Sequence, residues 1–208
     1  MYVAIAGNIG VGKSTLTGLL AERYDLKPIY ESVDENPYLA DFYRDMKTYS
    51  FHSQMFFLAE RLRQHLRQVN PGDRIIQDRT IYEDAAIFAR NLHNEGTMND
   101  RDFDSYQRMY EAIAATLRPP DLMIYLRARV PTLIQRIQER GRSYEADIDA
   151  GYLERLGDLY DAFFADYSLS RVVILPADDL DFVHSEDDRA RTFDLLEPHG
   201  LVAPMVRP

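Results

Sequence analysis

One stretch near the start of the sequence limits what this chain can fold into more than any other feature. It matches the phosphate-binding pattern GxxxxGK(S/T) and consists of Gly7, Asn8, Ile9, Gly10, Val11, Gly12, Lys13, Ser14 and Thr15. An apolar run from Tyr2 to Ala6 precedes it, and a helical pattern from Leu16 to Tyr24 follows. The glycines permit a tight turn whose N–H groups point at phosphate oxygens, and the following helix adds the positive end of its dipole. We therefore predict a P-loop over residues 7–15, in which Lys13 contacts the β and γ phosphates of ATP or another nucleoside triphosphate and Ser14 ligates Mg²⁺.

Composition and charge narrow the class of protein. At 208 residues with 46% hydrophobic side chains, the chain can bury a sizeable core, and we expect residues 1–208 to form one domain. A net charge of -10 disfavours nonspecific binding to nucleic acid, which needs clustered lysines and arginines. The sequence has no cysteine, no apolar run that would span a membrane and no basic leader before the P-loop. We therefore expect a cytoplasmic protein without a membrane or nucleic-acid partner.

Apolar runs alternate with helical patterns along the chain. Strands are predicted at Tyr2–Ala6, Pro28–Val33, Arg74–Gln77, Leu122–Leu126 and Arg171–Leu175. Helices are predicted at Leu16–Tyr24, Tyr38–Met46, Ser50–Val69, Tyr82–Leu92, Asp100–Leu117, Pro131–Glu139, Gly151–Tyr167 and Glu186–Leu196. This alternation is typical of an α/β protein with the P-loop NTPase fold, a five-stranded parallel sheet flanked by helices on both faces.

Charged residues follow two of the predicted strands. Glu31 stands near the end of the second, and Asp78 and Arg79 follow the third. Ligands of open α/β sheets bind outside the carboxyl ends of the strands, so we expect these side chains beside the P-loop. A carboxylate there would repel a phosphorylated acceptor but can take the proton of a hydroxyl, which favours an alcohol as phosphate acceptor. Asp78 is expected as a Mg²⁺ neighbour of Ser14, and Arg79 as the group that orients the hydroxyl. The alternatives are an exposed loop carboxylate and a capping aspartate with a paired arginine.

The long helix predicted around residues 50–69 carries an apolar stripe and two polar side chains near it. The stripe consists of Phe51, Met55, Leu58, Leu62, Leu66 and Val69. Gln54 and Arg61 stand two turns apart and project from nearly the same face, with Phe57 between them. A buried amide or guanidinium needs hydrogen-bond partners. A site residue pair is one interpretation, and a surface amide with a snorkelling arginine is the other.

Three arginines gather near the end of the helix predicted at Pro131–Glu139. Arg136 and Arg140 share a helix face, and Gly141 lets the chain turn so that Arg142 can converge with them. In an acidic protein this local positive charge suits a transferring phosphoryl group. We expect an Arg-rich lid over about residues 136–146, with a solvated basic face as the alternative.

Taken together, these residues resemble the deoxynucleoside kinase family over nearly the whole chain. The resemblance rests on Gly7 to Thr15, Glu31 with Val33 and Asn36-Pro37-Tyr38, Gln54 to Arg61, Asp78-Arg79-Thr80 to Asp84, and Arg136 to Glu145. It implies Mg²⁺-dependent transfer of phosphate from ATP or another NTP to the 5′-hydroxyl of a 2′-deoxynucleoside, in nucleotide salvage. By this resemblance Glu31 is the general base, Arg79 steers the hydroxyl, and Ser14 and Asp78 neighbour the metal. Arg140 and Arg142 contact the donor from the lid.

The resemblance also implies residues that hold the nucleoside. Tyr43 and Glu145 fall where relatives bind the sugar 3′-hydroxyl, and the base-reading positions hold Gln54, Phe57, Arg61 and Asp84. An amide and an Arg-Asp pair offer both donors and acceptors. By the resemblance this set suits adenine, guanine or cytosine, so we expect a purine, with deoxycytidine as a second substrate. The acidic loop Asp178-Asp179-Leu180-Asp181 falls near the donor adenine in the family.

Family members are usually dimers through the long helix, which leads us to expect a homodimer through residues 50–69. The sequence departs from many relatives at Ser32, Thr80 and Tyr144, which fits bacterial-type members better. Two other functions remain open. A nucleoside monophosphate kinase, such as a thymidylate kinase, would need a positive group where Glu31 stands. A regulatory P-loop switch would carry an Asn-Lys-x-Asp motif, which this sequence lacks.

Overall fold

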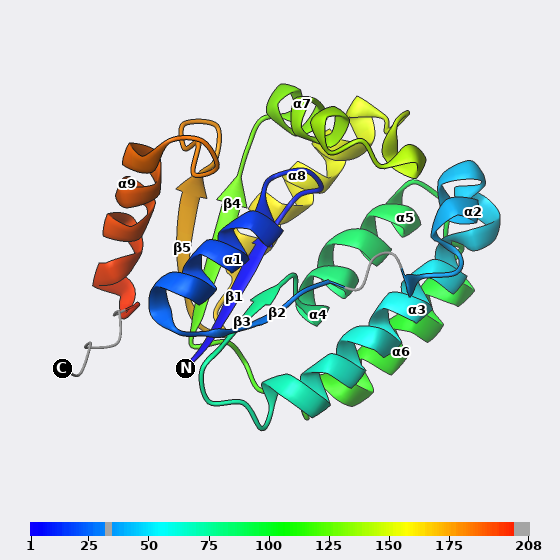
Figure 1. Ribbon diagram of the computed structural model, residues 1–208. Coiled ribbons are helices and arrows are strands. Elements are labelled where there is room, and N and C mark those ends of the chain that lie inside the picture. Colours follow the sequence, from blue (N-terminus) through cyan, green and yellow to red (C-terminus); the bar gives the residue numbers. More distant parts are fainter. Residues whose placement is uncertain (32–34, 202–208) are drawn as a thin grey trace.

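The core of the computed structural model, which describes residues 1–31 and 35–201, is a five-stranded parallel sheet. Its strands are β1 (Tyr2–Gly7), β2 (Lys27–Ile29), β3 (Ile75–Asp78), β4 (Leu122–Arg127) and β5 (Arg171–Pro176). They lie in the order β2-β3-β1-β4-β5, with β1 in the centre (Figure 1). All six residues of β1 are buried, as expected for a central strand covered on both faces. The predicted α/β fold is confirmed.

Helices surround this sheet and join its strands. They are α1 (Lys13–Tyr24), α2 (Leu39–Arg44), α3 (Met46–Gln64), α4 (Ile81–Glu83), α5 (Arg90–Asn94), α6 (Asp100–Ala114), α7 (Val130–Arg140), α8 (Ala150–Asp166) and α9 (Glu186–Leu196). Two π-helical segments, η2 (His65–Val69) and η3 (Asp84–Ala89), continue α3 and join α4 to α5. Short 3₁₀ turns occupy η4 (Ser143–Glu145) and η5 (Glu197–His199). Every helix in the described residues is too short or too polar to cross a membrane.

Side chains of β1 alternate between two apolar layers. Val3 and Ile5 pack with residues of α1, α7 and α9, whereas Tyr2 and Ala4 pack with residues of η3 and α8. A third cluster lies outside the sheet and is built from α2 to α6, which stand together at one side of the molecule (Figure 1). The sheet edge therefore faces a separate helical wall, and the space between them is where Glu31 and Arg79 lie.

Several boundaries differ from those predicted. Strand β2 ends at Ile29, because it pairs with β3 over only three residues; Val33, the predicted end, lies outside the described residues. The long helix begins at Met46 rather than Ser50, because the Asp45 side chain accepts a hydrogen bond from the Thr48 amide and caps it. The η4 turn was not predicted.

Candidate active site

The P-loop connects β1 to α1, and its glycines adopt backbone conformations that other residues rarely take. Gly10 has φ 82° and Gly12 φ 104°. A Cβ on Gly10 would lie 2.7 Å from Cγ1 of Ile137 and 2.8 Å from the Leu133 carbonyl oxygen, so α7 leaves no room for a side chain there. Nζ of Lys13 donates to the Asn8 carbonyl oxygen at 2.9 Å, and burial lowers the pKa of Lys13 to about 8. This geometry is that of a phosphate cradle.

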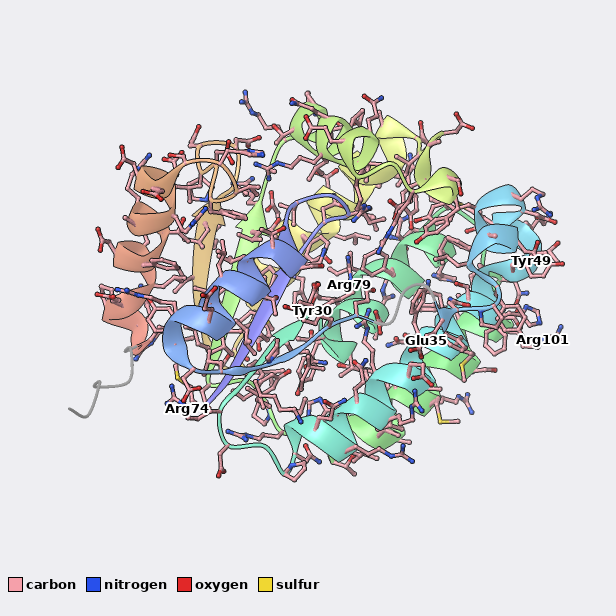
Figure 2. All side chains as sticks on the ribbon, in the orientation of Figure 1. Tyr30, Glu35, Tyr49, Arg74, Arg79 and Arg101 are labelled. Carbon is pink, nitrogen blue, oxygen red and sulfur yellow. The ribbon has the colours of Figure 1, made fainter. Side chains whose placement is uncertain are left out.

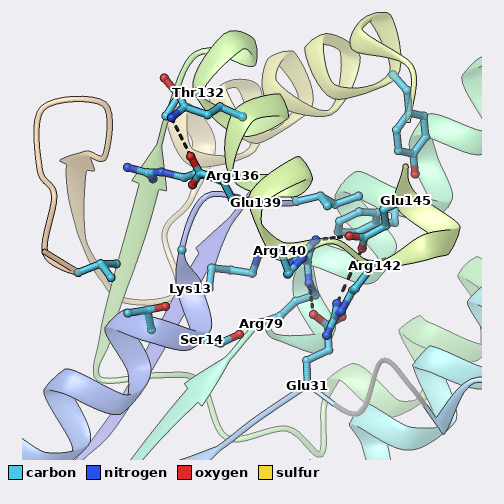
Figure 3. Close-up of a pocket in the computed structure, with 18 of the residues that line it drawn as sticks. Lys13, Ser14, Glu31, Arg79, Thr132, Arg136, Glu139, Arg140, Arg142 and Glu145 are labelled. Carbon is cyan, nitrogen blue, oxygen red and sulfur yellow. Dashed lines mark hydrogen bonds and ion pairs between the residues drawn. The ribbon is translucent and has the colours of Figure 1, made fainter. Parts of the chain in front are cut away.

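A cavity of about 850 Å³ runs from the P-loop to the helical wall. The predicted site residues that line it are Ile9, Gly10, Gly12, Lys13, Ser14, Thr15, Glu31, Tyr43, Gln54, Phe57, Arg79, Asp84, Arg136, Arg140, Arg142 and Glu145. The other predicted site residues do not line the cavity, but each takes part in a hydrogen bond. They are Gly7, Asn8, Val11, Arg61 and Asp78. Figure 3 shows Lys13 and Arg79 pointing toward the same space as Glu31, Arg140 and Arg142. The structure therefore brings residues from distant parts of the chain into one site.

Glu31 lies between two guanidinium groups. Its Oε1 accepts from Nη2 of Arg61 at 2.5 Å, and its Oε2 accepts from Nε of Arg79 at 3.1 Å. Burial alone would raise the pKa of Glu31, but the charges of Arg79, Arg61 and Lys13 together lower it to about 2. The carboxylate is therefore ionised at neutral pH and fixed in orientation, and the interpretation as an exposed loop residue is wrong.

The far end of the cavity holds the residues expected to read a base. Nε of Arg61 donates to Oδ2 of Asp84 at 2.5 Å, so one buried guanidinium joins Asp84 to Glu31. Burial raises the pKa of Asp84 to about 7, although Arg61 opposes this. Gln54 is buried, and its Oε1 lacks a hydrogen-bond partner among the described residues. A buried amide aimed into a cavity without a partner is available to a ligand. Arg61 is not a snorkelling surface residue.

Ser14 and Asp78 form the predicted metal neighbourhood at the end of β3. The Ser14 hydroxyl donates to Oδ2 of Asp78, while Oδ1 of Asp78 has no hydrogen-bond partner in residues 1–31 and 35–201. Burial raises the pKa of Asp78. In the part of the chain that the structure describes, no three His, Cys, Asp or Glu side chains group so as to hold a metal ion by themselves. Oxygen donors at the P-loop nevertheless fit Mg²⁺, which takes one or two protein ligands beside phosphates and water.

Of the three arginines near the end of α7, Arg140 and Arg142 meet at Glu145, whereas Arg136 has other partners, so the predicted convergence of all three is not seen. Arg136 donates from Nη1 to the Val11 carbonyl oxygen at 2.9 Å and from Nη2 to the Ala177 carbonyl oxygen at 2.8 Å, so it ties the P-loop to the loop after β5. Arg140 instead forms an ion pair with Glu145, and Nη1 of Arg142 lies 3.8 Å from the same carboxylate (Figure 3). The helix spacing placed Arg136 and Arg140 on one face correctly, but long side chains on that face reach different partners.

Tyr43 and Glu145, expected at the sugar, both lie in the cavity wall. Glu145 is held by Arg140 and Arg142, and the Tyr43 ring stacks on Tyr144 at 5.8 Å. In the loop after β5, Asp178, Leu180 and Asp181 line the cavity, and Asp178 also accepts hydrogen bonds from the Arg129 amide at the start of α7. Ser32 lies outside the described residues.

The sequence did not indicate three residues that surround Arg79, the buried Glu83 and Tyr160 and the partly buried Phe88. The Phe88 ring lies 4.4 Å from the guanidinium carbon of Arg79, and Nη1 of Arg79 donates to the Tyr160 hydroxyl at 2.9 Å. Glu83 accepts hydrogen bonds from that hydroxyl and from the Thr80 amide. Thr80 and Glu83 form a capping box, a pattern the sequence alone displays. Nothing local in the sequence marks Phe88 or Tyr160, because their contacts with Arg79 arise from tertiary packing. Arg79 itself is 4% exposed and lies near the centre of the view in Figure 2, whereas the exposed Arg101 lies at its edge.

Known proteins with similar sequences belong to one family of kinases. The family model described as deoxynucleoside kinase matches residues 3–199. The deoxyadenosine/deoxycytidine kinase of Bacillus subtilis is 38% identical over 196 residues, which cover 93% of this chain and 90% of that protein. The deoxyguanosine kinase of Bacillus subtilis is 35% identical over 201 residues, covering 91% of this chain and 93% of that protein.

Solved structures agree in fold. The structure of deoxyadenosine kinase from M. mycoides with bound dATP superposes with a TM-score of 0.84 at 30% identity, covering 95% of this chain and all of that one. A second structure of that enzyme, with the products dCMP and a flexible dCDP bound, gives a TM-score of 0.83 at 30% identity and covers 95% of this chain and 99% of that one.

Proposed function

This chain belongs to the deoxynucleoside kinase family, and we propose that it transfers the γ-phosphoryl group of ATP or another NTP to the 5′-hydroxyl of a 2′-deoxynucleoside. The observation that carries this proposal is the position of Glu31. An ionised carboxylate, fixed by Arg61 and Arg79, shares one cavity with the phosphate-binding Lys13. Such a group accepts the proton of an alcohol and repels a phosphate, so the acceptor is a nucleoside rather than a nucleoside monophosphate.

The residues of the chain divide the work of transfer. The P-loop amides and Lys13 hold the donor phosphates, and Arg79, at 3.1 Å from Glu31, orients the attacking hydroxyl beside its base. Ser14 and Asp78 would hold Mg²⁺. The Ser14 hydroxyl donates its hydrogen bond to Asp78, so the lone pairs of the Ser14 oxygen are available to the metal. When bound there, Mg²⁺ would supply positive charge that offsets the negative charge of the donor phosphates. Glu31 takes the hydroxyl proton late, once the attacking oxygen has become acidic.

We propose that about residues 136–146, the end of α7 and the segment that follows it, serve as the lid. They belong to a single kinase domain that spans residues 1–208. Arg140 and Arg142 both line the cavity and both contact Glu145. They are therefore close enough to share their charge between Glu145 and a donor phosphate. Arg136, bound to two carbonyl oxygens, anchors the base of the lid instead.

A purine is the preferred base in this proposal, with deoxycytidine as a second substrate. Gln54 and Asp84 line the same end of the cavity as the Phe57 ring, and the free Oε1 of Gln54 complements an amino group. Adenine, guanine and cytosine each carry an amino group, and thymine carries none. The names of the relatives, which act on deoxyadenosine, deoxycytidine or deoxyguanosine, support this choice.

Product analysis tests the function directly. The chain is incubated with ATP and Mg²⁺ and with deoxyadenosine, deoxyguanosine, deoxycytidine, thymidine or thymidine monophosphate, and products are separated by chromatography. We expect 5′-monophosphates from the first three nucleosides and little from thymidine. A diphosphate from thymidine monophosphate, with every nucleoside left unchanged, would show a monophosphate kinase. Release of phosphate without any phosphorylated acceptor would instead show a P-loop switch.

Asp84 leads to a prediction for pH dependence. Because burial raises the pKa of Asp84 to about 7, its ionised fraction increases strongly between pH 6 and pH 8. The adenine amino group donates to an ionised carboxylate, so KM for deoxyadenosine should fall roughly tenfold across this range. Guanine presents the acceptors O6 and N7, which a protonated carboxyl serves, so KM for deoxyguanosine should rise. Steady-state kinetics in Asp84→Asn, which carries no charge at either pH, should show neither trend. An unchanged trend in that variant would assign the titration to another group.

We also propose a homodimer that associates through α3, η2 and α6. Leu58 and Val69 of the predicted apolar stripe are buried, and Phe51, Met55 and Leu62 are partly buried against the third cluster. Leu66 and Met109, however, are 47% and 49% exposed on helices of the same outer wall. Large exposed apolar side chains favour association. Leu66→Glu with Met109→Glu should convert a sedimenting dimer into a monomer, while Leu195→Glu on α9 should not. A monomer before any substitution would refute the proposal.

The cellular setting is part of the same proposal. ATP is the donor that the P-loop and Lys13 fit, and a nucleoside acceptor with a free 5′-hydroxyl arises from the breakdown of nucleotides. We therefore place the enzyme in nucleotide salvage in the cytoplasm.

A further inference from the structure

A buried carboxylate that takes no part in the mechanism above lies behind the phosphate cradle. Glu83 is 0% exposed. Its Oε1 accepts from the Gly7 amide at 3.3 Å, and its Oε2 accepts from the Thr80 amide at 2.8 Å and from the Thr80 hydroxyl at 3.2 Å. Gly7 begins the P-loop, and Thr80 directly follows Arg79. One side chain therefore holds both the start of the phosphate cradle and the turn that carries Arg79.

The same carboxylate reaches the Arg79 side chain through a tyrosine. The Tyr160 hydroxyl donates to Oε1 of Glu83 at 2.7 Å and accepts from Nη1 of Arg79 at 2.9 Å. Nη1 of Arg79 also lies 3.9 Å from Oε1 of Glu83. Burial raises the pKa of Tyr160, so the hydroxyl keeps the proton that this chain of hydrogen bonds needs. Tyr160 and Glu83 hold Nη1 of the Arg79 guanidinium, and its Nε donates to Glu31.

The backbone of Arg79 needs such support. Its φ of 65° lies in the left-handed region, which a non-glycine residue seldom occupies unless its surroundings hold it there. Hydrogen bonds fix both sides of this turn, because the Arg79 amide donates to the Ile5 carbonyl oxygen at 2.9 Å and the Thr80 amide donates to the Glu83 carboxylate. One anchor is therefore β1, and the other is Glu83 of α4, which also accepts from the Gly7 amide.

We propose that Glu83 is a positioning residue for phosphoryl transfer, which sets the position of Arg79 relative to the P-loop through the Gly7 and Thr80 amides and through Tyr160. This inference rests on the proposed kinase function. In-line transfer depends on the alignment of the hydroxyl with the γ-phosphate, and small displacements of the aligning groups are costly. Glu83 acts on that alignment without touching a substrate.

The test compares Glu83→Gln with the unmodified enzyme. Glutamine keeps the size of the side chain, but an NH₂ group replaces one of the two acceptor oxygens. The glutamine side chain therefore cannot accept hydrogen bonds from both amides and from the Tyr160 hydroxyl. We expect kcat to fall by about 10- to 100-fold while KM for ATP and for the nucleoside changes by less than about threefold. Tyr160→Phe should give a smaller fall of the same kind. Tyr106→Phe, which removes a buried hydroxyl without a hydrogen-bond partner among the described residues, is the matched control and should keep the normal kcat.

A double-mutant cycle separates positioning from general damage to the fold. If Glu83 acts through Arg79, then Glu83→Gln should lower kcat by less than about threefold in an Arg79→Lys background. Losses that simply multiply would overturn the inference. So would a fall in kcat that follows the melting temperature of the variants, or a normal kcat in Glu83→Gln.

Amide hydrogen exchange measures the protection of the Gly7 and Thr80 amides by Glu83 and needs no substrate. Exchange at Gly7 and Thr80 should be faster in Glu83→Gln than in the unmodified chain, and unchanged in Tyr106→Phe. Unchanged exchange at both amides would overturn the inference whatever the activity. If the unmodified chain forms no nucleoside monophosphate while Glu83→Gln speeds this exchange, the proposed function fails but the role of Glu83 in placing the two loops is supported.

Discussion

Replacing Glu31 with glutamine is expected to lower kcat by about 10²- to 10⁴-fold, the contribution typical of a general base. The side chain keeps its size, and its oxygen can still accept from Arg61 or Arg79, but an amide cannot take the hydroxyl proton. The charges of Arg79 and Arg61 hold the pKa of Glu31 near about 2, so the wild-type residue stays ionised through the neutral range. The wild-type kcat should therefore show no decline due to Glu31 between pH 8 and pH 5.

Two further variants make the Glu31 experiment decisive. Glu31→Asp keeps the charge but shortens the reach, so it should recover part of the lost kcat if distance to the hydroxyl matters. Glu22→Gln removes an exposed carboxylate on α1 and should leave kcat unchanged. Single-turnover kinetics that show a normal chemical step in Glu31→Gln would remove Glu31 from the role of base.

Replacing Arg61 with methionine is expected to destabilise the fold by about 3–5 kcal/mol, the loss seen when one partner of a buried ion pair is removed. The Arg61 side chain is 3% exposed and binds two carboxylates at 2.5 Å each, those of Glu31 and Asp84. Methionine would fill much of the space but would leave both carboxylates without this partner. Urea denaturation at pH 8 measures the change in the free energy of unfolding.

The double variant Arg61→Met with Asp84→Asn shows whether charge is the cause. Neutralising Asp84 should restore a large part of the lost stability, because the less compensated of the two carboxylates is then uncharged. Without Arg61, Asp84 binds a proton more readily in the folded than in the unfolded chain, so the loss should be smaller at pH 6 than at pH 8. A loss that is equal at both pH values, and that Asp84→Asn does not reduce, would assign it to packing instead.

The sequence was most informative where a pattern is local. Buried parallel strands are nearly continuous apolar runs, so Tyr2–Ala6 and Leu122–Leu126 were predicted to within one residue of β1 and β4. The P-loop was equally clear, because its spacing follows from the backbone geometry of one turn. Strand ends then indicated Glu31, Asp78 and Arg79, since every parallel strand delivers its carboxyl end to the same edge.

What could not be predicted depends on contacts between distant segments. The spacing of Arg136 and Arg140 defines a helix face, but it does not say that one side chain turns back to the Val11 carbonyl while the other pairs with Glu145. The contact between Arg79 and Tyr160 joins residues 81 positions apart, and no periodicity encodes it. The π-helical segment that begins at Asp84 likewise packs against α3 and α8, which are distant in the sequence.

The bonds of Arg136 have a consequence for redesigning this enzyme. One guanidinium joins α7 to the Val11 carbonyl oxygen of the P-loop and to the Ala177 carbonyl oxygen after β5. The helix is therefore hydrogen-bonded to both loops. Gly141, with φ 71°, marks where that fastened part ends. Residues 142–149 follow this point, so we expect that exchanging them for the corresponding segment of a relative leaves the bonds of Arg136 in place.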